Sequence, residues 1–119
     1  MSDAEQRQAR RRVLRQEAFR LTATWDLPDL EGESDSEIEL GLIARAEALR
    51  LVERELVADA EAGGPRSAPW GTGPARQWWA RTVLPAAREH RDASWWIRRS
   101  PREAVSWAIA LDPGGASRE

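Results

Sequence analysis

Histidine is the first residue to consider for acid–base chemistry, because its side chain titrates near neutral pH. This chain of 119 residues has one histidine, His90, which lies among the charged residues Arg88, Glu89, Arg91 and Asp92. A lone histidine near the end of an expected helix is more often structural than catalytic. We therefore predict no catalytic residue, and an enzyme that uses His90 is the least favoured of three functional hypotheses.

Other catalytic signatures are missing from the sequence. It has no Cys and no Lys, which removes disulfides, thiolate metal sites and Schiff-base chemistry. It has no paired Glu-x-x-His motif, no HExxH, no P-loop and no GxGxxG. The short run Gly71-Thr72-Gly73 could hold an anion at a helix start, but three residues are a weak signal. We expect neither a metal nor a cofactor.

Arg45 and Glu53 are charged residues that project onto the apolar face of an expected helix over residues 36–61. A buried Arg–Glu pair is more often structural, or part of an interface, than catalytic. The sequence therefore predicts an interface or buried pair between Arg45 and Glu53, with carboxylate chemistry as the alternative.

Tryptophan is unusually frequent, with seven in the chain and six of them between residues 70 and 107. Neighbours on a helix are about 100° apart, so the adjacent pairs Trp78–Trp79 and Trp95–Trp96 cannot each centre on one face. At least one tryptophan of each pair is predicted at a rim, a loop junction or a partner surface. Trp and Arg are enriched in interface hot spots. The predicted partner-binding residues are Phe19, Trp70, Trp78, Trp95, Trp96, Arg98 and Arg99.

Arginine supplies all 18 basic residues. Its abundance beside Ala, Gly and Pro, which share GC-rich codons, indicates a high-GC bacterial genome and weakens an argument from phosphate binding. Nucleic-acid binding is still the second hypothesis, and residues 75–111 could form a helix-turn-helix. Its candidate residues are Arg7, Arg10, Arg11, Arg12, Arg15, Arg88, Arg91 and Arg102. The net charge of −2 and the acidic segment 26–39 argue against it.

The first helix is expected over residues 3–24, with Ser2 and Glu5 as a capping box. Its apolar stripe consists of Leu14, Ala18, Leu21 and Trp25. The stripe does not continue toward the N-terminus, where it meets arginines. Residues 1–12 are therefore expected to form a basic arm or a helix extension.

The second helix follows an acidic loop, with Ser34 or Ser36 as its cap, and should end at Gly63-Gly64-Pro65. Leu40 and Leu51 lie opposite its main apolar face, and a helix with two apolar sides usually contacts two partners. A third helix starts at Pro74 and is kinked or ended by Pro85.

The C-terminal part contains the strongest local signal in the chain. Ser100-Pro101-Arg102-Glu103 combines an N-cap, a proline at the first helical position and a glutamate at the third. The last helix should reach about residue 111, and residues 112–119 form a flexible tail. Residues 92–99 could be helical or extended.

Together these patterns predict one all-α domain over residues 1–119, a small bundle of four to five helices around a long central helix. The polar start and the absence of an apolar run of about 18 residues predict a soluble, cytoplasmic protein without a membrane partner. The favoured function is a non-catalytic interaction module, or a small subunit of a larger assembly, that binds a protein partner or self-associates.

Overall fold

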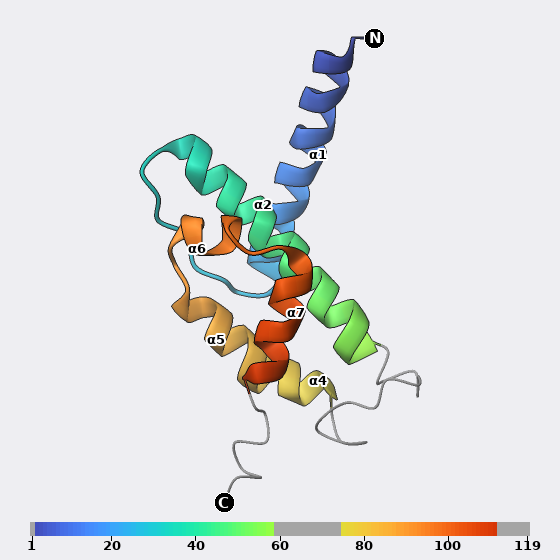
Figure 1. Cartoon of the computed structure of the whole chain (residues 1–119), viewed down its shortest axis with the longest axis vertical. Coiled ribbons are helices and arrows are strands. Elements are labelled where there is room, and N and C mark those ends of the chain that lie inside the picture. The colour runs from blue at the N-terminus through green and yellow to red at the C-terminus, as the bar shows by residue number, and fades with distance from the viewer. Residues whose placement is uncertain (1, 59–74, 112–119) are drawn as a thin grey trace, which may run out of the picture.

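The chain is built from helices, as Figure 1 shows for the computed structural model, which describes residues 2–58 and 75–111. The α-helices are α1 (Asp3–Thr24), α2 (Asp35–Val52), α4 (Ala75–Trp78), α5 (Leu84–Glu89), α6 (Ala93–Ile97) and α7 (Pro101–Ala110). Two π-helical segments continue them, η1 (Glu53–Ala58) after α2 and η2 (Trp79–Val83) between α4 and α5. The predicted all-α class is confirmed.

Helix α1 begins where its cap predicted, because the Ser2 hydroxyl accepts a hydrogen bond from the Glu5 amide. Its N-terminal half is exposed as far as Val13, and it extends beyond the other helices (Figure 1). Ala18 and Leu21, from the predicted stripe, are buried in the second half. Helix α1 is therefore attached to the bundle through its C-terminal half only.

The C-terminal end of α1 is closed by a Schellman motif, in which the Leu27 amide donates to the Thr22 carbonyl at 2.9 Å. The residue that makes this turn is Asp26, with a φ of 52°. A second closure comes from α5, where the Arg88 guanidinium donates to the carbonyl oxygens of Trp25 and Asp26. These bonds satisfy helix-end carbonyls and fix the start of the acidic loop.

Helix α2 and its continuation η1 form the centre of the bundle and contact α1, α6 and α7. Its buried residues lie on several sides of the helix and include Leu42, Ile43, Ala46, Ala48, Leu49 and Val52. Of the two residues predicted opposite the main apolar face, Leu51 is partly buried against the core and Leu40 is 42% exposed, so the chain covers the second side only in part. The long central helix is confirmed over residues 35–58, and its expected last turn lies outside the described residues.

Helix α6 crosses α2 at Gly41, where the two backbones come unusually close. A Cβ atom added to Gly41 would lie 2.6 Å from the Cβ and 2.8 Å from the Cα of Ala93. The acidic loop is held to the same place, because Glu31 and Asp92 form an isolated parallel bridge. Gly41 is therefore required by packing, although glycine weakens a helix interior.

The C-terminal half follows the predicted helix boundaries. Pro85 lies in the first turn of α5, directly after the π-helical interruption η2. Residues 93–97 are helical, with Asp92 as the N-cap, which settles a segment that the sequence left open. Ser100 and Glu103 form the complete capping box of α7. Residues 59–74 and the tail predicted over 112–119 lie outside the described residues.

Candidate functional site

Trp78 and Trp79 are both buried, with 5% and 3% of their surface exposed. The prediction that one of this pair lies at a rim is therefore wrong. The two neighbours still point in different directions, but this part of the chain is covered on more than one side. The two rings are also covered from different elements, because Trp79 packs edge-on against Trp25 and α4 contacts η1. Trp78 is a core residue and offers no surface to a partner.

The second pair behaves as expected, with one buried and one partly exposed ring. Trp96 is 1% exposed and its indole N–H donates to the His90 carbonyl at 2.7 Å. Trp96 therefore also belongs to the core, whereas Trp95 is half-buried. Trp70, another predicted partner-binding residue, lies outside the described residues.

His90 is the C-cap residue of α5 and stacks on Trp95, with ring centroids 3.7 Å apart and an interplanar angle of 12°. Trp96 and Trp107 approach the same imidazole edge-on. Burial, reinforced by the positive charge of Arg99, lowers the pKa of His90. The imidazole is therefore neutral at pH 7, and its surroundings are those of a packing residue where α5, α6 and α7 meet.

Arg99 lies over the Trp95 ring, with its guanidinium carbon 3.8 Å from the ring centroid. It also donates a hydrogen bond to the Trp95 carbonyl at 3.1 Å. A cation of the chain itself thus already occupies the position that an aromatic cluster offers to a bound cation. Arg98, its neighbour, is exposed.

Arg45 is the one charged residue among the buried side chains of the described core, with 1% of its surface exposed. It donates to the Pro28 carbonyl at 2.8 Å and to the Thr22 hydroxyl at 3.2 Å. Burial lowers its pKa to about 10, and the negative charge of Asp29 opposes this effect. Arg45 therefore remains charged at pH 7 and ties the acidic loop to α2.

The predicted pair between Arg45 and Glu53 does not form, because Glu53 instead makes an ion pair with Arg76 of α4. The two residues are eight positions apart, which is about 12 Å along a helix axis. Although Arg45 and Glu53 share a helix face, they are too far apart to pair, and each binds a group on another segment.

The predicted nucleic-acid arginines are divided between structural contacts and the surface. Arg102 makes two hydrogen bonds to the Glu55 carboxylate, and Arg88 closes the end of α1. Arg11 and Arg15 both bind Glu39 of α2, at 2.8 and 3.5 Å. The remaining predicted arginines, Arg7, Arg10, Arg12 and Arg91, are exposed.

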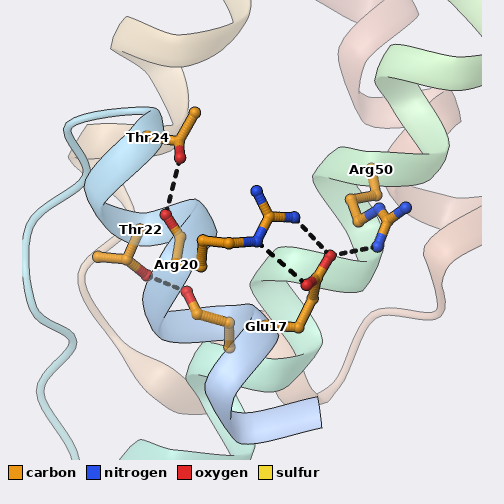
Figure 2. Close-up of polar contacts among 6 residues, drawn as sticks. Glu17, Arg20, Thr22, Thr24 and Arg50 are labelled. Atoms are coloured by element: carbon orange, nitrogen blue, oxygen red, sulfur yellow. Dashed lines mark hydrogen bonds and ion pairs between the residues drawn. The ribbon is translucent and has the colours of Figure 1, made fainter. Parts of the chain in front are cut away.

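Ion pairs fix the position of α1 on α2. Figure 2 shows the Glu17 carboxylate between Arg20 of the same helix and Arg50 of α2. The hydrogen bond from Arg20, reinforced by both positive charges, holds the pKa of Glu17 below its usual value. The two Glu39 pairs use Arg15 and Arg11, which lie about half a turn and nearly two turns before Glu17. Helix α1 is thereby held in one orientation, with its first half pointing away from the bundle.

A groove of about 440 Å³ lies between α1 and the N-terminal half of α2. Its lining residues are Arg15, Phe19, Asp29, Leu30, Asp35, Ile38, Glu39 and Leu42. Phe19 is 54% exposed, which is unusual for a side chain of this size. The groove is therefore lined by apolar and charged side chains together.

A second hollow, of about 310 Å³, adjoins this groove and is lined by Gln8, Arg11, Arg12, Arg15 and Glu39. Arg15 and Glu39 line both hollows, so the two are neighbours on the surface. We call the residues of both hollows the α1–α2 surface. Phe19 was among the partner-binding residues predicted from the sequence, whereas Ile38 and Leu42 were not.

A third hollow, of about 460 Å³, is acidic and is lined by Glu31, Gly32, Glu33, Glu37, Asp92 and Ser94. Within residues 2–58 and 75–111, no group of three or more His, Cys, Asp or Glu residues is placed to hold a metal ion. None of the helices in the described part of the chain is long and apolar enough to span a membrane.

These features define a small all-α protein with a partly apolar groove between α1 and α2. Comparison with known proteins adds no family, since no protein-family model, no curated protein and no solved structure matches the chain. Any assignment of function therefore depends on the α1–α2 surface itself.

Proposed function

We propose that this protein is a non-catalytic interaction module, or a small subunit of a larger assembly, that binds a protein partner through the α1–α2 surface. The observation that carries the proposal is the exposure of Phe19 in a groove that Leu30, Ile38 and Leu42 also line. Aromatic residues, phenylalanine included, are enriched in protein interfaces, and burying this ring on a partner would remove its apolar surface from water.

The N-terminal half of α1 supports the same proposal. Residues 3–13 form three turns of helix whose side chains are all exposed. A helix of this length is marginal in water without packing, so here it depends on its continuation into the bundle. A partner on the α1–α2 surface would supply packing that the chain itself does not.

The proposal retains Phe19 from the partner-binding residues predicted by the sequence, but not Trp78 or Trp96. Both tryptophans are buried, and their replacement would damage the core rather than an interface. Phe19, which is exposed on α1, is therefore the central partner-binding residue of the proposal.

A photo-crosslinking amino acid at position 19, introduced in the native host, tests the proposal. Ile109 on α7 is the matched control site, because it is an apolar residue with 44% exposure outside the α1–α2 surface. We expect one adduct that forms from position 19 and not from position 109. The purified partner should then bind the wild type and lose binding with Phe19→Ser. Equal labelling from both positions would contradict the proposal.

Nucleic-acid binding is the second candidate, and one observation favours it. Arg7, Arg10 and Arg12 are exposed on the projecting half of α1. The neighbouring acids weaken the case, because Glu39 already neutralises part of the basic hollow. Titration of labelled RNA and DNA at low salt tests it, since phosphate contacts give an affinity that falls steeply with salt. No binding at low salt would remove this candidate.

A further inference from the structure

Charge is divided between the two sides of the α1–α2 surface. The basic residues Arg11, Arg12 and Arg15 all belong to α1, whereas the acidic residues Asp29, Asp35 and Glu39 belong to the loop before α2 and to α2 itself. The apolar residues Phe19, Leu30, Ile38 and Leu42 come from both sides. The surface therefore has a basic end on α1, an acidic end on α2 and its preceding loop, and apolar residues from both.

Such a division of charge is self-complementary under twofold symmetry. In an isologous dimer the same surface of both copies is used, and a twofold axis places each end of it against the opposite end of the partner. An axis through the apolar residues sets the basic end of one copy on the acidic end of the other. A surface of one sign would instead repel a second copy.

We infer that the partner of the α1–α2 surface is a second copy of this chain, which rests on the proposed function above. Phe19 of each copy enters the apolar groove of the other, and the charged ends pair across the axis. Glu39 is already bound by Arg11 and Arg15 of its own chain, so Arg12 supplies the positive charge of the basic end that faces the partner.

The orientation of α1 makes this arrangement possible. Helix α1 packs on α2 through buried residues that include Ala18 and Leu21, and the ion pairs of Glu17 with Arg50 and of Glu39 with Arg15 add to this contact, so the basic hollow and the groove keep their relative positions. The N-terminal half of α1 then lies along the partner. An exposed helix thereby gains a packing surface in the dimer that it lacks in the monomer.

Sedimentation velocity of the full chain over a wide concentration range tests the inference. We expect a reversible equilibrium between monomer and dimer. Phe19→Ser should weaken dimerisation by about tenfold or more, as expected for a central aromatic anchor. Ile109→Ser, which removes an apolar group of similar exposure on α7, should leave the equilibrium unchanged. A monomer at every concentration, or a dimer unaffected by Phe19→Ser, overturns the inference.

Charge reversal provides a test that misfolding cannot imitate. Arg12→Glu and Asp35→Arg should each weaken self-association, because each places like charges across the axis at both ends. An equimolar mixture of the two variants should restore the dimer, since the mixed pair again has opposite charges at both ends. Glu33→Arg makes the same change of charge outside the α1–α2 surface and should have little effect. A mixture that remains monomeric overturns the inference.

Failure of this inference is distinguishable from failure of the proposed function. If the chain is monomeric but crosslinks to a different protein from position 19, the α1–α2 surface is an interaction site and the second copy is the wrong partner. If neither dimer nor specific adduct forms, both are wrong.

Discussion

Asp26 is a single residue on which the path from α1 into the acidic loop depends. Its φ of 52° lies in the left-handed region that glycine adopts without steric cost. Helix ends of this type usually have glycine at this position. The aspartate is tolerated here because the surrounding hydrogen bonds, including those of Arg88, hold the turn in place.

We therefore expect Asp26→Gly to stabilise the protein by about 0.5–1 kcal/mol, because relief of the left-handed conformation exceeds the added entropy of the unfolded chain. Asp26→Ala should destabilise it, since alanine has the same steric cost without a polar side chain. Urea denaturation followed by tryptophan fluorescence measures both. A loss of stability with glycine would show that the aspartate side chain itself supports the turn.

His90 gives the protein a dependence on pH that can be derived from its surroundings. Its pKa is lowered from 6.5 by burial and by Arg99, so near pH 6 the unfolded chain binds more protons than the folded one. Stability then rises with pH in this window. The stability that neutral His90 contributes is therefore complete above pH 6.5, and it is lost as the pH falls through the pKa of His90 in the folded protein.

We expect the urea midpoint to fall between about pH 7 and about pH 5, and His90→Gln should remove most of that change. Carboxylates whose pKa is lowered, such as Glu17, take up protons below their ordinary pKa of 4.5, so they change the stability outside this window. A wild-type midpoint that stays constant over the same range would show that the stacked imidazole accepts a proton without cost.

At the scale of helices, the sequence predicted the boundaries well because the chemistry that sets them is local. Ser2, Ser34 and Ser100 each accept a hydrogen bond from a backbone amide three residues later, and those spacings are visible in the sequence. The packing between helices was less accessible. Trp78 was misplaced because both sides of its helix are covered by other elements, and the partners of Arg45 lie on α1 and on the acidic loop.

The crossing of α2 and α6 is a packing feature that the sequence did not reveal. Alanine normally stabilises a helix by about 1 kcal/mol relative to glycine. At Gly41, however, the added Cβ would lie 2.6 Å from the Cβ of Ala93. We expect Gly41→Ala to destabilise the protein by about 1–3 kcal/mol, the usual cost of overpacking.

Thermal or urea denaturation measures this effect, and Glu47→Ala, at an exposed position of the same helix, is the control. Glu47→Ala should change stability by no more than about 0.5 kcal/mol. If Gly41→Ala were as stable as the wild type, α6 would have to be able to move away from α2 without loss.

At the scale of the whole molecule, the basic arm over residues 1–12 and the acidic segment over residues 26–39 meet in the fold. The basic first helix lies against the acidic start of α2 through the Glu39 pairs, and Arg102 reaches Glu55. The sequence showed that such charged segments exist, but which residues pair depends on the helix packing. The same holds for the α1–α2 surface, since Phe19 could be recognised as unpartnered while its neighbours from the acidic loop and α2 could not.

The exposed N-terminal half of α1 should contribute to association but little to the stability of the fold. Residues 3–12 bury no apolar side chain, and they are joined to α2 by the surface ion pair of Arg11 with Glu39. Exposed ion pairs contribute little to stability. A chain that begins at Val13 should therefore keep its helical bundle, with a melting temperature within about 5 °C of the wild type.

The same truncation removes Arg11 and Arg12 from the basic end of the α1–α2 surface, so it should strongly weaken the dimer. Circular dichroism and sedimentation velocity on one sample measure the two effects together. The control is Arg7→Ala, a change within the removed segment at a residue that does not line the surface. A truncated chain that unfolds would show that the projecting half is part of the folding unit, and one that dimerises normally would place the interface elsewhere.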